Sequence, residues 1–348
     1  MYPLAVHCKA VVVVPNSDAM LGRAKVSAKK SIVVSRQPMP AEPKRLRNSP
    51  SEMFAFVSAI IDTADGRKLA YIEFGDPSAP LVIHNHGGPS CRLEGQLLAG
   101  GAIKNGLRLV AVDRPGIGQS TKQNHRTYKG WCDDMTTIAD ALGYEQFGVS
   151  GWSEGGPFPI AAAFYIDQSR LRHVTSIAGG NFGTFGDNWA AQYQDKADAL
   201  GGKLAMHSKF AFHMMYEMLG LDAKHFRKSY LKTCYKAVND YDKKLLDEPG
   251  VGDAWEDLAA ECFAQGSIGL VDDSELLYHK WDFDVTKIER PIHMWQGTDD
   301  HLIPYELNKQ IADRMPGTVW HVVEGGGHLI AVGEADKIFA IATEELKE

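Results

Sequence analysis

The sequence lacks several features that would assign it to specialised protein classes. Its five cysteines lie far apart without a Cys-x-x-Cys pair, which is typical of free thiols in a reducing compartment rather than of a disulfide framework. No apolar run reaches the roughly 18 residues of a membrane-spanning helix, and no His-x-x-x-His spacing suggests a zinc site. A net charge of −7 gives no basis for nucleic-acid binding. We therefore expect an intracellular globular protein with no metal, no nucleic-acid partner and no membrane span.

The first fifty residues differ in composition from the rest. They contain nine Lys or Arg and only two acidic residues, Asp18 and Glu42, a net of +7 that leaves −14 on the remaining chain. A basic, acid-poor, Ser-containing segment is typical of an organellar transit peptide and also of a disordered tail. Lys9 interrupts the apolar run before "VVVV", which disfavours a secretory signal. We expect residues 1–50 to be such a tail or transit peptide, in a protein of the cytoplasm, plastid or mitochondrion.

From about residue 55 the chain alternates short apolar runs with turns and helical segments. The runs "AFVSAIID" and "KLAYIEFG" flank Asp65-Gly66, which is a strong hairpin signal. Later runs are typical of strands covered on both faces: "LVIHNHGG", "LRLVAVDRPG", "QFGVSGW", "HVTSIAGG", "PIHMWQG" and "TVWHVVEGG". Between two of them, residues 128–142 place their apolar side chains on one helical face. The pattern predicts an α/β fold whose mostly parallel sheet is flanked by helices and has one antiparallel edge.

One long insertion interrupts this alternation. About 110 residues between "HVTSIAGG" and "PIHMWQG" have helical character and little strand signal, which is too long for a loop. We predict a helical cap, or lid, over residues 183–285, inserted into a core formed by residues 51–182 and 286–348. The Met and aromatic side chains of the cap are expected mainly to pack, with some lining an apolar binding pocket.

The stretch "VSGWSEGGP", residues 149–157, carries the strongest chemical signal. Ser153 lies in a Gly-x-Ser-x-Gly motif between a predicted strand and a predicted helix. This is the context of a nucleophilic serine held on a strained turn, with glycines where side chains would clash. The alternative is a surface turn that contains serine by chance, and the strand–turn–helix context argues against it.

A serine nucleophile needs a base that removes its proton and an acid that orients the base. His328 lies late in the chain behind a glycine run, in the place expected for the base. The other histidines lie in predicted strands, turns or the cap. Asp299 and Asp300 both follow the predicted strand "PIHMWQG" and both are candidates for the acid. The one that is not used would serve in the turn or cap the helix after Pro304.

The oxygen of an attacked carbonyl also needs fixed hydrogen-bond donors as it becomes negative. We expect these oxyanion-hole donors to be the backbone N–H of Glu154, directly after the nucleophile, and that of Gly88 in "HGGP". The Glu154 side chain has two interpretations: it stabilises the start of the following helix, or it faces the pocket and binds a cationic group such as an α-amino group. Trp152 and Glu154 are accordingly candidate substrate-binding residues.

The chain resembles α/β-hydrolase fold serine hydrolases with a helical lid over roughly residues 55–347. The resemblance lies in "DGRKLAYIEFGDP", "HGGPSCRLEG", "DRPGIGQST", "WCDDMTTIADALGYEQFGVSGWSEGGP" and "GTDDHLIP…GGGH". It implies the α/β-hydrolase fold and selects Asp300, four residues before a proline, as the acid. "HGGP" is similar to prolyl iminopeptidase-like enzymes, although these usually carry Trp after the serine whereas Trp152 precedes it. "GWSEGG" resembles the "GWSDGG" of valacyclovir hydrolase-like esterases, which favours a pocket-facing Glu154.

Together these features predict a serine hydrolase that needs no cofactor and no metal. Ser153 would attack an acyl carbon with His328 as base and Asp300 holding the ring, and water would then release the acyl-enzyme. The favoured substrate is a small or medium carboxylic ester. The alternatives are an aminopeptidase or a C–C bond hydrolase on the same residues, and a non-catalytic, receptor-like member of the fold. No pattern in the sequence sets the acyl chain length or the oligomeric state.

Overall fold

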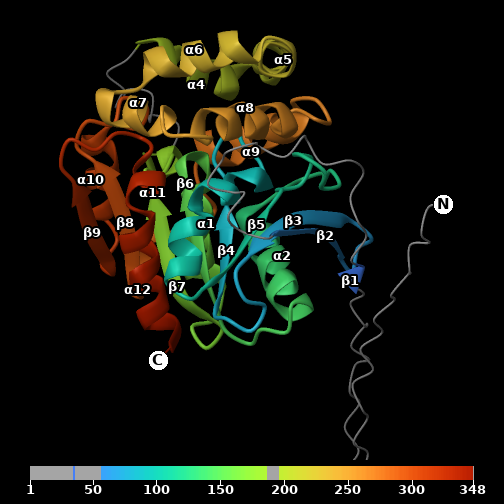
Figure 1. The fold of residues 1–348 in the computed structure, drawn as a ribbon, viewed down its shortest axis with the longest axis vertical. Helices are drawn as coiled ribbons and strands as arrows, with labels where there is room; N and C mark the ends of the chain where they lie inside the picture. The colour runs from blue at the N-terminus through green and yellow to red at the C-terminus, as the bar shows by residue number, and fades with distance from the viewer. Residues whose placement is uncertain (1–33, 36–55, 186–195, 348) are drawn as a thin grey trace, which may run out of the picture. The chain divides into compact units, whose positions relative to one another are not determined.

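The computed structural model describes residues 34–35, 56–185 and 196–347. Its strands form one nine-stranded sheet in the order β1-β2-β3-β5-β4-β6-β7-β8-β9 (Figure 1). The strands are β1 (Val34–Ser35), β2 (Phe56–Asp62), β3 (Lys68–Phe74), β4 (Leu81–Asn85), β5 (Arg108–Val112), β6 (Phe147–Trp152), β7 (Leu171–Ile177), β8 (Ile292–Gly297) and β9 (Thr318–Val323).

Helices occupy most of the remaining chain. The α-helices are α1 (Gly95–Lys104), α2 (Tyr128–Ala141), α3 (Pro157–Tyr165), α4 (Lys196–His207), α5 (Lys209–His225), α6 (Arg227–Ala237), α7 (Asp240–Leu246), α8 (Val251–Cys262), α9 (Ile268–Tyr278), α10 (Tyr305–Ala312), α11 (Ile330–Gly333) and α12 (Ala335–Lys347). Short 3-10 helices are η2 (Arg92–Glu94), η3 (Ser153–Gly155) and η5 (Val285–Lys287). None of the helices in the described residues combines the length and the apolar character that a membrane span requires.

The sheet has an antiparallel edge and a parallel remainder. The pairs β1–β2, β2–β3 and β3–β5 are antiparallel, and the pairs from β5–β4 through β8–β9 are parallel. A tight turn over residues 63–67 joins β2 to β3, and Gly66 adopts a φ of +86° there. The predicted α/β sheet with its antiparallel edge is therefore confirmed. The sheet also extends into the predicted tail, because Val34 and Ser35 pair with Ile61 and Ile60 of β2.

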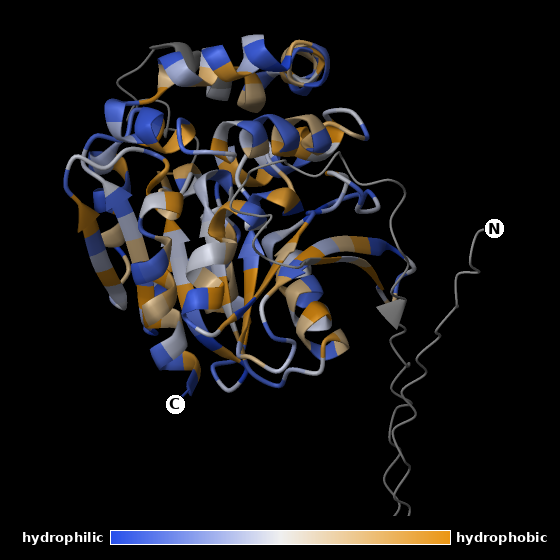
Figure 2. Ribbon diagram, in the orientation of Figure 1, coloured by the Kyte–Doolittle hydropathy of each residue, from blue (hydrophilic) through white to orange (hydrophobic). Residues whose placement is uncertain are grey.

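Helices cover both faces of the sheet because alternate residues of a strand point to opposite sides. On β5, Leu109 and Ala111 belong to the apolar core beneath α1 and α12. Val110 and Val112 belong to the core beneath α2 and α3. Figure 2 shows hydrophobic residues along the strands and hydrophilic residues on the outer parts of the helices. The central strands are thus buried on both faces, and functional side chains must emerge at strand ends.

Six helices, α4 to α9, follow one another between β7 and β8, and the described residues there include no strand. These helices lie together over one end of the sheet, with α5 and α6 outermost (Figure 1). Apolar side chains of α5, α8 and α9 continue the core that lies beneath α1 and α12. This arrangement agrees with a helical cap, whose proposed extent of residues 183–285 we retain. Part of that range, residues 186–195, lies outside the described residues.

Candidate active site

Ser153 occupies a strained turn directly after the central strand β6. Its φ of +56° lies in the left-handed region, which is uncommon for a residue other than glycine. The turn leads through η3 into α3, which begins at Pro157. Backbone strain of this kind is typical of functional positions, and here it presents the serine at the carboxyl end of the parallel strands. The strand–turn–helix context predicted for the motif is present.

The two motif glycines are required by close backbone contacts. A Cβ atom on Gly151 would lie 2.2 Å from the carbonyl oxygen of Gly155. A Cβ atom on Gly155 would lie 2.1 Å from the carbonyl oxygen of Asn85 at the end of β4. Neither position has room for a side chain, so the turn stays pressed against the neighbouring strand.

His328 and Asp300 are brought together beside this turn, and Asp299 is not. The His328 Nδ1 atom lies 3.0 Å from Asp300 Oδ2. The other Asp300 oxygen, Oδ1, accepts hydrogen bonds of 2.9 Å from the N–H groups of Leu302 and Ile303. The Asp300 side chain is fully buried, whereas the Asp299 side chain is 58% exposed. The carboxylate that can orient the imidazole is therefore that of Asp300.

The electrostatic surroundings favour the charged form of His328. Burial by itself lowers the pKa of this imidazole, but the charge and hydrogen bond of Asp300 outweigh burial and raise the pKa above its ordinary value. The negative charges of Asp242 and Glu94 act in the same direction. A ring that accepts a proton readily is suited to take one from a serine hydroxyl.

Trp152 links the histidine to the nucleophile. Its Nε1 atom donates a 2.9 Å hydrogen bond to the His328 carbonyl oxygen, and the two ring centroids are 5.9 Å apart. The indole is only 1% exposed. Among the hydrogen bonds of the described residues, none joins the Ser153 hydroxyl to the His328 ring, which is common for such a pair before substrate binds. The indole therefore holds the His328 backbone beside the turn.

The "HGGP" loop leaves one N–H group available next to Ser153. The Gly87 N–H donates to both carboxylate oxygens of Glu94, at 3.1 and 3.0 Å. The Gly88 N–H has no acceptor in the part of the chain that the structure describes. A Cβ atom on Gly87 would lie 3.1 Å from Ser153 Cβ, so the loop runs directly beside the nucleophile. Arg114 fixes the same loop by donating to the carbonyl oxygens of His86 and Gly87.

The Glu154 side chain lies against the same loop. A Cβ atom on Gly88 would lie 1.9 Å from Glu154 Oε2. This oxygen is buried and has no hydrogen-bond partner, although the Tyr216 hydroxyl of α5 hydrogen-bonds the carboxyl group. Burial, together with the charge of Asp273, raises the pKa of Glu154 to about 7, and Arg114 acts in the opposite direction. The side chain therefore faces α5 of the cap and the loop that contains Gly88 rather than solvent.

Comparison with known proteins identifies the family. A family model described as alpha/beta hydrolase fold matches residues 80–335, well over half of the chain. The chain belongs to the α/β-hydrolase fold family. A proline iminopeptidase of Lacticaseibacillus rhamnosus (strain Lc 705) is 22% identical over 298 residues, covering 80% of this chain and 94% of the relative. A bifunctional esterase/perhydrolase of Acinetobacter calcoaceticus is 24% identical over 257 residues, covering 71% and 84%.

Solved structures agree with the fold. An esterase from Exiguobacterium antarcticum matches with a TM-score of 0.60 at 18% identity, covering 83% of this chain and 99% of that one. An α/β-hydrolase fold protein from Nakamurella multipartita matches with a TM-score of 0.59 at 21% identity and the same coverage. The family and these relatives support a hydrolase and leave the substrate open.

The structure adds a residue that the sequence did not indicate. Asp242 of the cap helix α7 is fully buried, and its two carboxylate oxygens accept 2.8 Å hydrogen bonds from the N–H groups of His328 and Leu329. A Cβ atom on Gly327 would lie 2.3 Å from Asp242 Oδ2, so the glycine run lets the loop approach the carboxylate. In the sequence Asp242 is only one acid in the first turn of a helix, and 86 residues separate it from His328.

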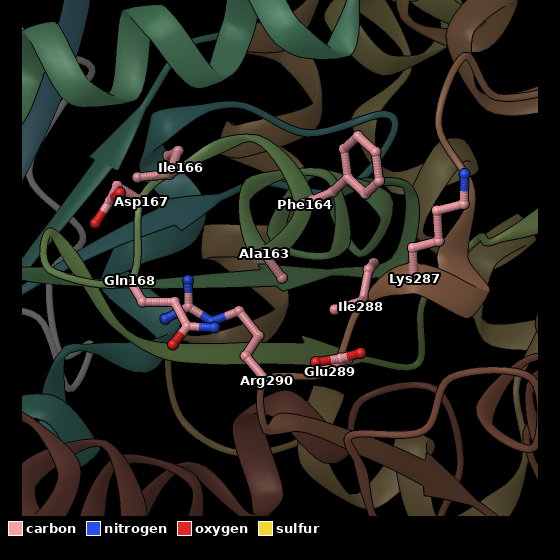
Figure 3. Close-up of a pocket in the computed structure, with 9 residues that line it drawn as sticks. All are labelled: Ala163, Phe164, Ile166, Asp167, Gln168, Lys287, Ile288, Glu289 and Arg290. Atoms are coloured by element: carbon pink, nitrogen blue, oxygen red, sulfur yellow. The ribbon is translucent and has the colours of Figure 1, made fainter.

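A separate pocket of about 320 Å³ lies near the amino ends of β7 and β8 (Figure 3). Ser153, in contrast, follows the carboxyl end of β6. Its lining residues come from the end of α3, the loop before β7 and the segment from the last residue of η5 to β8, and include Phe164, Lys287 and Arg290. It contains none of Ser153, Asp300 and the histidine beside them. This hydrolase therefore has a surface hollow that does not belong to the candidate active site.

The first prediction separates the two neighbouring aspartates. Asp300→Asn keeps the size of the side chain but removes the charge that orients His328, so hydrolysis of a nitrophenyl ester should fall by about 10⁴-fold. Asp299→Asn changes an exposed group and should leave the rate nearly unchanged. Steady-state kinetics of the two purified variants decide the matter, and an inactive Asp299 variant would overturn the assignment.

The second prediction concerns Asp242 as a positioning residue. Asp242→Asn leaves one of the two loop N–H groups without an acceptor, and the resulting shift of His328 should lower kcat about 10- to 100-fold with little change in KM. Loss of the Asp242 charge should also lower the pKa of His328. Because the neutral ring is the base, the acid limb of the kcat profile should move to lower pH.

The matched control for this change is Asp240→Asn on the same helix, where the side chain is 89% exposed. Its rate and pH profile should equal those of the unaltered protein. An unmoved acid limb in the Asp242 variant would show that the carboxylate acts only on the fold.

Proposed function

We propose that this α/β hydrolase cleaves small or medium carboxylic esters through an acyl-enzyme intermediate. Ser153 is the nucleophile, His328 the general base and Asp300 the residue that orients and stabilises the imidazolium. The observation that carries the proposal is the serine at a φ of +56° beside a buried His328–Asp300 pair. Trp152, a candidate substrate-binding residue in the sequence, positions His328 through its hydrogen bond to the His328 carbonyl oxygen.

The reaction follows from these positions. His328 takes the Ser153 proton as the serine oxygen bonds to the acyl carbon, and the carbonyl oxygen becomes negative between the Gly88 and Glu154 N–H groups. The imidazolium returns the proton to the leaving alcohol as the ester bond breaks. Water then repeats the sequence on the acyl-enzyme, with His328 as base, and releases the carboxylic acid.

Two kinds of relative bear on the substrate. The Acinetobacter calcoaceticus relative is named an esterase/perhydrolase and the Exiguobacterium antarcticum structure an esterase, which agrees with ester cleavage. The Lacticaseibacillus rhamnosus relative is named a proline iminopeptidase, which keeps cleavage of an amino-terminal residue as the second candidate. Both reactions use the same acyl transfer, and they differ in the leaving group and in whether the substrate carries an amine.

The Glu154 side chain favours substrates that carry a cationic group near the scissile bond. Its buried Oε2 atom has no partner, and its pKa of about 7 shows that the ionised form is poorly compensated. An ammonium group in the pocket would supply both a hydrogen bond and the missing positive charge. We therefore propose α-amino esters as the preferred esters of this site, with the corresponding amides as the second candidate.

The third prediction tests the nucleophile. Ser153→Ala should lower hydrolysis of a short-chain nitrophenyl ester by at least about 10³-fold, because the attacking oxygen is lost while the fold is retained. A fluorophosphonate probe should label the unaltered protein and leave the variant unlabelled. An unaltered protein that neither hydrolyses esters nor accepts the probe would favour the receptor-like alternative.

The fourth prediction tests the acid next to the nucleophile. The unaltered protein should hydrolyse an α-amino ester with a higher kcat/KM than an uncharged ester of equal size. Glu154→Gln removes the charge but keeps the size and the backbone N–H, so it should abolish that preference and spare the uncharged ester. An equal loss on both substrates would show that Glu154 only supports the turn, and a parallel assay on a matched amide separates peptidase from esterase activity.

A further inference from the structure

A second cluster of polar side chains lies between the sheet and its last helix. His173 of β7 and His293 of β8 both point at Glu345 of α12. His173 Nδ1 lies 2.6 Å from Glu345 Oε2, and His293 Nε2 lies 2.9 Å from Glu345 Oε1. The two rings stack with their centroids 5.5 Å apart, and the ligand atoms of all three residues lie within 4.8 Å of one another. Two imidazole nitrogens and a carboxylate thus converge on one point.

The other nitrogen of each ring is also held. His173 Nε2 lies 2.7 Å from the Thr175 hydroxyl, and His293 Nδ1 lies 2.9 Å from His321 Nε2. His321 in turn stacks on Trp295, with ring centroids 4.2 Å apart and an interplanar angle of 9°. Metal-binding histidines usually have such a partner on the nitrogen that does not bind the metal, because the partner fixes the tautomer and the ring orientation.

These polar groups occupy positions where apolar side chains would be more stable. His173 and His293 are 1% and 7% exposed. The neighbouring inward-facing residues on this side of the sheet and on α12 form an apolar core, as Ile338 and Phe339 do. Burial of polar and ionised groups in such a place is unfavourable relative to packing of hydrocarbon, even when they pair with one another. Polar side chains at these buried positions therefore indicate that the site binds a polar or charged ligand, which apolar side chains could not bind.

We propose that His173 Nδ1, His293 Nε2 and the Glu345 carboxylate form a binding site for one zinc ion. Two imidazoles and a carboxylate are a donor set that suits Zn²⁺, at bond lengths of about 2.0–2.2 Å. In the bound state each neutral ring coordinates the ion through the nitrogen that faces Glu345, and its single proton lies on the other nitrogen, which donates it to Thr175 or His321. The Glu345 side chain is 29% exposed, which gives water access as the fourth ligand.

Burial and nearby charges act on the residues of this cluster. Burial lowers the pKa of His173, and the hydrogen bond and charge of Glu345 oppose this shift without cancelling it. Burial alone would raise the pKa of Glu345, but hydrogen bonds from His173 and His293 lower it to about 2, so the carboxylate is ionised. Arg290 repels a cation, and this opposes the attraction of Glu345.

The site is structural and does not depend on the proposed hydrolysis. His293 is the second residue of β8 and His173 the third of β7, so both lie toward the ends of the strands opposite Ser153. A bound ion would fasten α12 to the sheet. The sequence predicts no metal because it lacks a His-x-x-x-His spacing, whereas 172 residues separate His173 from Glu345.

The experiment is a metal titration of the full chain after treatment with a chelator. Co²⁺, a probe with visible absorption, should bind at one equivalent per chain with a tetrahedral spectrum that Zn²⁺ abolishes, and Zn²⁺ should raise Tm. Glu345→Gln keeps size and hydrogen bonding but removes the anionic ligand, and should weaken binding at least about tenfold. Glu344→Gln, the exposed neighbour on the same helix, should bind like the unaltered protein.

The outcome does not rest on any variant folding, because the unaltered protein gives the primary result. Absence of a Co²⁺ spectrum and of a Zn²⁺-dependent rise in Tm would overturn the proposal and leave the cluster as a hydrogen-bonded network. Equal weakening by the Glu344 and Glu345 changes would also overturn it. Ester hydrolysis should be the same with and without Zn²⁺, so failure of the proposed hydrolysis and failure of the metal site are separate results.

Discussion

The left-handed backbone of Ser153 is the constraint on which the rest of the site depends. Such a conformation costs about 1–3 kcal/mol and persists only where the surroundings enforce it. Here the enforcement comes from the close contacts of Gly151 and Gly155, one with the turn itself and one with the end of β4. Because β6 lies between β4 and β7, the strand that carries the turn is paired on both sides. The serine is positioned by strand packing rather than by a flexible loop.

The cap does more than cover one end of the sheet, because it also holds the loops that carry the proposed acid and base. Asp242 in α7 binds the backbone of the histidine loop, and Asn239 both caps α7 through Asp242 N–H and donates to Asp299 at 3.0 Å. One short cap helix thus contacts the loops that carry the acid and the base. The buried Trp152 side chain also holds the loop that carries His328, through its hydrogen bond to the His328 carbonyl oxygen. Displacement of α7 would therefore remove two hydrogen bonds from the loop that carries His328.

Local patterns in the sequence predicted the features of the structure that depend on residues close together in the chain. Strand alternation, the Asp65-Gly66 turn and the Gly-x-Ser-x-Gly motif depend on neighbouring residues, so the sheet, its antiparallel edge and the position of Ser153 followed from them. The choice of Asp300 over Asp299 depended on the resemblance to α/β hydrolases. Two adjacent aspartates have the same local sequence context, and only the folded structure determines which side chain points toward His328. Contacts between distant segments gave no sequence signal: Asp242 looked like an ordinary residue of a helix start. The same holds for the histidines that meet Glu345.

The negative charge of the Glu154 carboxylate would lie close to the proposed position of the oxyanion, which is also negative. The Glu154 backbone N–H is one of the two proposed oxyanion donors, while the carboxyl group of the same residue lies against Gly88, the other proposed donor. An ionised carboxylate there would oppose the oxyanion, and the pKa of about 7 shows that the protein only partly compensates this charge. The positive charge of Arg114 compensates it in part, but Arg114 also binds Asp273 and the carbonyl oxygens of His86 and Gly87. A substrate with its own positive charge would neutralise Glu154 as it binds, so the carboxylate would cease to oppose the oxyanion when the reaction begins.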